Sequence, residues 1–178
     1  MTHLLFHNDP SLAARVTKQM YDHYDADQVF GGEYWNGEGG CFIGCIAHGN
    51  SVERVQELTG LPIMLTRIAE SIFEGLPPVE RPQFFKDMTD AMGANIGKDV
   101  TLVPWLFLYD TVGRALRLTG MEEKCSEALE VLRLKSVGSH VSSDATSNAA
   151  DAAADAAAAA YAAERRAQAT KLLELLNA

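Results

Sequence analysis

The sequence predicts an all-α fold: a compact multi-helix bundle that ends in a long alanine-rich C-terminal helix. Apolar residues recur at helical spacing in most segments, and sustained period-two alternation, which is typical of a half-buried strand, does not occur. No Asn-Gly or Asp-Gly pair lies between two β-branched runs, so a hairpin signal is also missing. A chain of 178 residues has room for one hydrophobic core and one appended element.

The first helix is predicted to begin at Pro10. Asp9 is a favourable N-cap, and a proline in the first helical position costs no hydrogen bond. Apolar side chains then follow at four-residue spacing: Leu12, Val16, Met20 and Tyr24. This spacing indicates one buried face of an amphipathic helix.

Five more helices are predicted in the middle of the chain. They are a short helix from Ser51 to Gly60, a helix over 61–73 closed by Gly75-Leu76-Pro77-Pro78, a short helix after Pro82, a longer one over 102–118 and a last one over 121–135. Ser51 is a typical N-cap, and Gly60 is a typical residue at a helix end. Pro104 would lie in the first turn of its helix, where proline is tolerated.

Composition changes sharply at Ser136, which predicts three parts. Residues 1–135 form a helical globular domain, the small polar residues 136–148 form a flexible linker, and residues 149–178 form the alanine-rich helix. Aspartates near the start of this helix and arginines near its end agree with the helix dipole. The helix would be roughly 45 Å long. Because alanine allows close approach of another backbone, it would pack on its own domain or on a second copy, and we expect a homo-oligomer through this helix.

Charge and hydropathy exclude several classes of function. A net charge of −9 disfavours nucleic-acid binding, because an acidic field repels phosphates. Outside the alanine tract no run of about 18 apolar residues could cross a membrane. The first residues lack the pattern of a secretory signal, and three cysteines, which cannot all pair, fit a reducing compartment. We therefore expect a cytoplasmic protein that binds neither membranes nor nucleic acid.

The segment from Gly37 to Gly49 contains two of the three cysteines, one histidine and five of the 14 glycines. On a helix that begins near Cys41, the side chains of Cys41, Cys45 and His48 would share one face. Seven residues rise about 10.5 Å, however, whereas the ligand atoms around zinc lie about 3 to 4 Å apart. All three therefore cannot bind one metal ion on a straight helix. Cys41 with Cys45, or Cys45 with His48, could bind one, but two further ligands would have to come from elsewhere. The candidates are His3, His7, His23 and Cys125, and none has a second ligand at a familiar spacing. The sequence thus predicts no metal and no cofactor.

Cys41 is also a candidate nucleophile, because free amides at a helix N-terminus stabilise a thiolate. Its base would have to come from another segment, and His23 is the nearest candidate in the sequence. The stretch from Gln19 to Glu53 contains six acidic residues and no lysine or arginine, and such a charge raises a thiol pKa. A thiol-dependent hydrolase or transferase with Cys41 and His23 as catalytic residues is therefore the alternative hypothesis.

The main functional hypothesis for the same segment is a binding site. An aromatic loop precedes the glycines, whose backbone amides could face a bound group. The predicted ligand-binding residues are Tyr34, Trp35, Gly39, Gly40, Cys41, Cys45 and His48. The competing structural interpretation is that both cysteines are small buried side chains and that Gly44 permits close helix packing.

A pattern of residues extends beyond the cysteine segment. It consists of Gly32, Tyr34, Trp35, Gly37, Gly39, Gly40, Cys41, Gly44, Cys45 and His48, then Glu57, Gly60-Leu61-Pro62 and Ile72 to Pro77, together with the alanine-rich tail. This pattern resembles that of an uncharacterised family of small proteins encoded by phages and bacteria. The resemblance implies a phage or mobile-element setting, in which small acidic helical proteins often bind and inhibit host factors. The main hypothesis is thus a non-enzymatic interaction protein, an accessory or anti-defence factor that binds a host protein or a small ligand.

Overall fold

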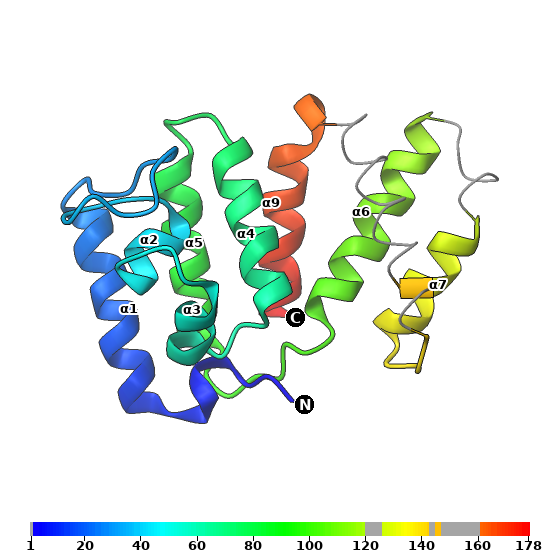
Figure 1. The fold of residues 1–178 in the computed structure, drawn as a ribbon, viewed down its shortest axis with the longest axis horizontal. Helices are drawn as coiled ribbons and strands as arrows, with labels where there is room; N and C mark the ends of the chain where they lie inside the picture. The colour runs from blue at the N-terminus through cyan, green and yellow to red at the C-terminus, as the bar shows by residue number, and fades with distance from the viewer. Residues whose placement is uncertain (1, 120–125, 143–144, 147–160) are drawn as a thin grey trace. The chain divides into compact units, whose positions relative to one another are not determined.

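The computed structural model describes residues 2–119, 126–142, 145–146 and 161–178, and in these residues the fold is all-α (Figure 1). The helices are η1 (Leu5–Asn8), α1 (Pro10–Asp25), α2 (Phe42–Ala47), α3 (Val52–Thr59), α4 (Ile63–Gly75), α5 (Arg81–Ala94), α6 (Val103–Thr119), α7 (Ser126–Ser136) and α9 (Tyr161–Asn177). The predicted fold class is confirmed. No named strand occurs in the described ranges, which hold only isolated bridges between single residues.

The helix ends follow the cap residues that the sequence contains. The Asp9 side chain accepts hydrogen bonds from the backbone N–H groups of Ser11 and Leu12, and this satisfies two otherwise unpaired donors at the start of α1. Ser51 does the same for Arg54 at the start of α3. Gly60 ends α3 with φ 75°, a left-handed conformation that glycine adopts without steric cost.

Contacts divide the chain into two compact units. The first unit holds residues 1–101 and 169–178, and the second holds residues 102–168. The division falls at Leu102, inside the range 1–135 that composition predicts as one domain. Large side chains with under 2% exposure form the core of the first unit: Phe6, Phe42, Phe73, Phe85, Leu5, Met20, Ile46, Leu61, Leu65, Ile72, Met88 and Met92.

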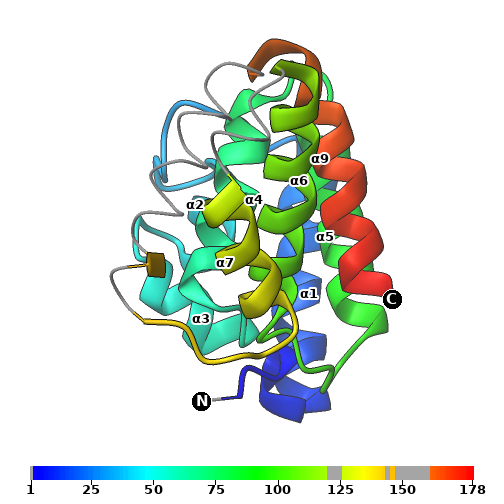
Figure 2. The same cartoon turned by 90° about the vertical axis from the view of Figure 1, so that its right-hand side faces the viewer.

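The short helix α2 lies in the middle of the first unit. It packs against α1, α3 and α4, while α5 packs against α1 and α4 (Figures 1 and 2). Phe42 at the start of α2 is fully buried and contacts the rings of Phe84 and Phe85 on α5. Residues 39–46 of the predicted cysteine segment are therefore part of the core of this unit.

The C-terminal end of α9 belongs to the first unit. Leu172 and Leu176 are fully buried, and the Lys98 Nζ donates a hydrogen bond of 3.0 Å to the carbonyl oxygen of Leu176. Asn95 Nδ2 lies 3.2 Å from Asn177 Oδ1. These leucines thus pack on their own chain. Most of the predicted linker's second half and the alanine tract before Tyr161 lie outside the described residues.

In the second unit, α6 and α7 lie side by side, as both views show (Figures 1 and 2). Val112, Ala115 and Leu116 of α6 form a small core with Leu132 of α7. Pro104 lies in the first turn of α6, as predicted. The start of the helix predicted over 121–135, with Cys125, lies outside the described residues.

The turn η1 has no counterpart in the predicted elements. Phe6, His7 and Asn8 all adopt left-handed backbone conformations, with φ of 50°, 53° and 59°. Such conformations cost roughly 1 kcal/mol or more for each residue that is not glycine. The turn buries the Phe6 side chain completely, and Leu5 exchanges backbone hydrogen bonds with Gly97 and Lys98. Tertiary packing therefore overrides local preference here.

Candidate functional site

The helix α2 is shorter than the sequence suggests. It begins at Phe42, with Cys41 as its N-cap, and it ends at Ala47. His48 follows in a left-handed conformation with φ 50°, so it does not continue the helix. The expected single face with Cys41, Cys45 and His48 is therefore wrong for His48, whose side chain leaves in a new direction.

Gly40 and Gly44 bring the aromatic loop onto α2. A Cβ atom added to either glycine would overlap the carbonyl oxygen of Tyr34. The loop backbone at Tyr34 and Trp35 thus rests directly on the start of α2, at a distance that only glycine permits. The sequence interpretation assigned this role to Gly44 against another helix, and the structure places a loop there instead.

The loop's backbone amides are used inside the protein. Three of these N–H groups donate to side chains: Gly32 to the Glu74 carboxylate, Gly39 to Asn36 Oδ1, and Ile43 at the start of α2 to Glu70 Oε2. Two others donate to backbone carbonyl oxygens: Gly40 to Gln28, and Cys41 to Glu33. Gly39 and Gly40 are also buried. The expectation that these glycine amides face a bound group is therefore not supported, and their hydrogen bonds fix the loop's shape.

Cys41 is buried, with 1% of its surface exposed. Burial raises the pKa of its thiol to about 12, and a hydrogen bond with the Glu70 carboxyl group acts in the same direction. Burial also raises the pKa of Glu70 above its ordinary value. A protonated thiol beside a carboxyl group is a poor nucleophile at neutral pH, because the thiolate is the reactive form.

Cys45 lies one turn further along α2 and is fully buried. Its Sγ donates to the carbonyl oxygen of Gly40 at 3.3 Å. Burial raises the pKa of this thiol to about 12 as well. Cys45 thus behaves as a small core residue with a satisfied thiol, as the structural interpretation of the sequence expects.

His23 contacts His48 rather than supplying a free base for Cys41. The Nε2 atoms of His23 and His48 lie 2.9 Å apart, and His23 Nδ1 lies 2.8 Å from Gln28 Oε1. Each ring nitrogen of His23 therefore has a hydrogen-bond partner, and neither partner is Cys41. His23 is buried on α1, whereas His48 is exposed, and burial of part of its ring together with the neighbouring His23 lowers the pKa of His48.

Trp35 contacts both imidazole rings. Its ring stacks on His48 with a centroid distance of 4.4 Å and an interplanar angle of 19°. It meets the His23 ring edge-on at 5.3 Å. Trp35 and His48, both predicted as ligand-binding residues, thus come together, and the structure adds His23 and Gln28 to the same cluster.

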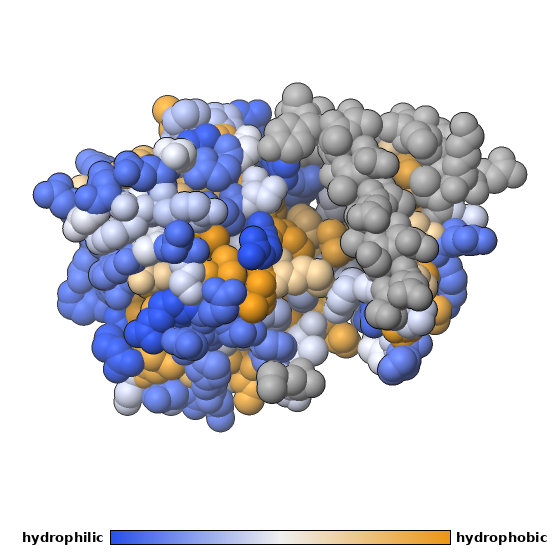
Figure 3. Space-filling model, viewed as in Figure 1, coloured by the Kyte–Doolittle hydropathy of each residue, from blue (hydrophilic) through white to orange (hydrophobic). Residues whose placement is uncertain are grey.

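Tyr34 has 50% of its surface exposed. Its neighbours Glu33 and Glu38 on the loop are exposed, and so are Asp25 and Asp27 at the end of α1. On the face drawn in Figure 3, hydrophilic residues cover most of the surface over α1 and the loop that follows it. The loop therefore exposes the Tyr34 side chain together with the carboxylates of Glu33 and Glu38.

One group of three potential metal ligands lies at the buried end of the site. A Cys41 Sγ and carboxylate oxygens of Glu70 and Glu74 all lie within 4.8 Å of one another. Glu74 is already engaged, because it accepts the Gly32 N–H and lies 3.7 Å from the Arg81 guanidinium. Internal hydrogen bonds and this ion pair account for the placement of all three side chains.

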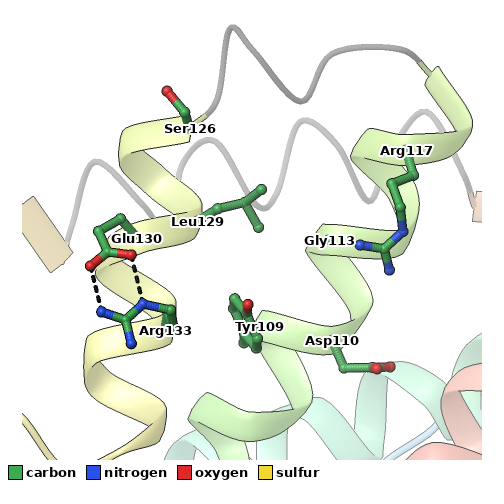
Figure 4. A pocket seen from close by; sticks show the side chains of 8 residues that line it. All are labelled: Tyr109, Asp110, Gly113, Arg117, Ser126, Leu129, Glu130 and Arg133. Atoms are coloured by element: carbon green, nitrogen blue, oxygen red, sulfur yellow. Dashed lines mark hydrogen bonds and ion pairs between the residues drawn. The ribbon is translucent and has the colours of Figure 1, made fainter.

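A separate pocket of about 280 Å³ lies between α6 and α7 in the second unit (Figure 4). It is lined by Tyr109, Asp110, Gly113, Arg117, Ser126, Leu129, Glu130 and Arg133. Figure 4 shows the Arg133 guanidinium paired with Glu130 through two hydrogen bonds of 2.7 Å, while Arg117 extends from α6 over Gly113. No residue of this pocket was predicted as a site residue, and its lining mixes both charges with Tyr109 and Leu129.

Comparison of the chain with protein-family models, with curated proteins and with solved structures gives no match. Within the described ranges, none of the helices combines the length and apolar character needed to cross a membrane.

Gln28, Glu70 and Glu74 are the site residues that the sequence interpretation missed. Each contacts the predicted segment or the aromatic loop before it: Gln28 through Gly40 and Cys45, Glu70 through Cys41 and Ile43, and Glu74 through Gly32. No spacing rule connects residues that lie 27 or 42 positions apart. The only available signal is that Glu70 and Glu74 lie at i and i+4 on one predicted helix face.

Proposed function

We propose that the chain is a non-enzymatic interaction protein that binds a basic surface of a host protein through the loop from Phe30 to Gly39. In line with the resemblance noted above, its setting would be a phage or mobile element, and its role that of an accessory or anti-defence factor. The exposed Tyr34 on a fixed acidic loop is the observation that carries this proposal.

Tyr34 has the properties of an interface anchor. Tyrosine offers a large amphipathic surface with few rotatable bonds, and it is enriched among the residues that dominate binding energies. Half of this side chain is exposed, although its backbone rests on Gly40 and Gly44. An aromatic residue held out from a rigid backbone loses little entropy when a partner covers it.

Hydrogen bonds within the loop support the same argument. Asn36 accepts N–H bonds from Glu38 and Gly39 and donates its own N–H to the Gly39 carbonyl. Phe30 donates to the Gly40 carbonyl and closes the base of the loop. Preorganisation of this kind increases affinity because the loop is already ordered before binding.

Charge indicates the class of partner. The exposed carboxylates of Glu33 and Glu38, on the same loop as Tyr34, and the net charge of −9 attract a basic protein surface and speed its association. A partner that itself binds nucleic acid would offer such a surface.

The alternative, a thiol-dependent hydrolase or transferase, has less support. It requires a reactive Cys41 and a nearby base. The Cys41 thiol, however, is buried and has a pKa of about 12. The ring nitrogens of His23 lie within hydrogen-bond distance of Gln28 and His48. The proposal of a binding protein needs neither an exposed thiol nor a free base.

Site-specific cross-linking in host cells tests the proposal. A photoreactive phenylalanine analogue replaces Tyr34 in one chain and Val79 in a control chain, since Val79 is 87% exposed on a different loop. We expect one protein adduct of defined mass at position 34, none at position 79, and a lower yield when salt is raised during irradiation of the lysate. Equal adducts at both positions, or only small-molecule adducts at position 34, would contradict the proposal.

A further inference from the structure

We propose that His23 and His48 form a two-histidine site for a divalent transition-metal ion, with Cu(II) as the ion that fits best. This inference is independent of the proposed protein partner. The sequence alone predicts no metal, because the two histidines lie 25 positions apart and only the fold brings them together.

Hydrogen bonding determines which nitrogens are available. The Gln28 Oε1 can only accept, so His23 Nδ1 carries the proton of a neutral ring and donates to it. The lone pair of neutral His23 is therefore on Nε2, and without metal the Nε2–H of His48 donates to it. An ion takes the place of this proton, which moves to Nδ1 of His48 or to water. A ligand histidine that donates its other N–H to a carbonyl oxygen is the usual arrangement in metal sites, because the bond fixes the tautomer and the ring.

The distance between the two nitrogens suits one ion. With metal–nitrogen bonds of about 2.0 Å, adjacent ligands in square-planar geometry lie about 2.8 Å apart, and those in tetrahedral geometry about 3.3 Å. The observed 2.9 Å between the Nε2 atoms is close to the first value. Square-planar or tetragonal nitrogen and oxygen sites are typical of Cu(II), which also binds most tightly among the common divalent ions.

The charges near the two histidines favour a cation, and solvent exposure of His48 lets an ion reach the Nε2 atoms. His48 is exposed, so its ring can tilt to direct both lone pairs to one point, and water can complete the coordination. Trp35 stacks on His48 and touches His23, which limits the entropy that the rings lose on binding. The stretch from Gln19 to Glu53 has no lysine or arginine to repel the ion.

Fluorescence of Trp35 gives a local readout of copper binding. The chain has two tryptophans, so a Trp105→Phe background leaves Trp35 as the only tryptophan, whose emission is excited selectively over that of the tyrosines. Cu(II) is added to this chain, to the same chain with His48→Gln, and to a control with His140→Gln. His140 is exposed and lies in the other unit, so its replacement removes one histidine without touching the cluster.

We expect saturable quenching of Trp35 with one ion per chain, unchanged by His140→Gln. His48→Gln should raise the half-saturating copper concentration by about tenfold or more, since even outer partners of metal ligands contribute ~10- to 100-fold. Circular dichroism checks that the exposed His48→Gln substitution leaves the helices intact. Equal quenching of the His48→Gln and His140→Gln chains would overturn the proposal.

Electron paramagnetic resonance of the copper-loaded, otherwise unmodified chain provides the second measurement. Two imidazole nitrogens should split the Cu(II) signal, and the pattern should change to that of fewer nitrogens in the His48→Gln chain. A spectrum without this change, or with oxygen ligands only, would show that the histidines form a hydrogen-bonded pair and not a metal site.

Discussion

Gly44 is the residue on which the placement of the aromatic loop depends. Its missing side chain leaves room for the Tyr34 carbonyl group, and this contact places Trp35 next to His48. The loop, the imidazole pair and the start of α2 are thus connected through one position. Any other residue at this position would carry a Cβ atom that overlaps the Tyr34 carbonyl oxygen, so the contact requires glycine.

Replacing Gly44 by alanine should therefore destabilise the protein strongly. The new Cβ would overlap the backbone of Tyr34, which cannot move without disturbing the loop's hydrogen bonds, and we expect a loss of about 3 kcal/mol. Gly49→Ala is the matched control, because no atom lies within 4 Å of the added Cβ. It should change stability by no more than about 0.5 kcal/mol. Urea unfolding followed by circular dichroism measures both, and equal effects would refute the close-contact argument.

The thiols of Cys41 and Cys45 should react slowly with iodoacetamide at neutral pH. A pKa of about 12 in place of 9 lowers the thiolate fraction, and burial blocks access, so we expect rates at least about a hundredfold below that of free cysteine. Peptide mass spectrometry separates the two sites, and the same chain in urea is the control. Fast labelling of Cys41 in the folded chain would revive the nucleophile hypothesis.

At the scale of helices, local signals predicted the ends well where a cap residue is present. Asp9 and Pro10 begin α1, and Ser51 and Gly60 bound α3, as their side-chain and backbone chemistry requires. The end of α2 was not predictable in this way. Glycine is the usual residue in the left-handed position at a helix end, but here His48 adopts that conformation and Gly49 follows it. The His48 side chain contacts Trp35 and His23, which lie in other segments of the chain.

The end of α9 should contribute to the stability of the first unit. Leu172 and Leu176 are fully buried, so Leu172→Ala should cost about 2 to 5 kcal/mol through lost apolar contact and a residual cavity. Glu174→Ala, on the exposed side of the same helix, should cost less than about 0.5 kcal/mol. Thermal unfolding of the three chains measures the difference. A small effect of Leu172→Ala would mean that α9 does not dock on this unit in solution.

At the scale of the whole molecule, the fold class followed from periodicity, but the site's composition did not. The pairs Cys41–Glu70 and His23–His48 join segments that become neighbours only when α1, α2 and α4 pack together. Sequence spacing constrains residues within one helix, whereas it says nothing about which helices meet. Sequence patterns therefore identify the cysteine segment but not the residues of other helices that contact it.

Stability of the whole protein should fall at alkaline pH. The folded state keeps the Cys41 and Cys45 thiols protonated up to a pKa of about 12, while the unfolded chain releases these protons near pH 9. Between these values the folded state binds more protons, so each thiol lowers the free energy of unfolding by up to about 1.4 kcal/mol per pH unit. Urea unfolding between pH 8 and 11 should show this slope, which should be shallower in a Cys45→Ala chain. An identical slope in both chains would contradict the assigned burial effect.

The central claim is that the exposed loop binds a partner without thiol chemistry. The most direct test places Cys41→Ala in the chain that carries the photoreactive residue at position 34. The measured quantity is the yield of the partner adduct, with circular dichroism as the check on folding. We predict the same yield with and without the thiol. A folded Cys41→Ala chain that forms no adduct would contradict the claim.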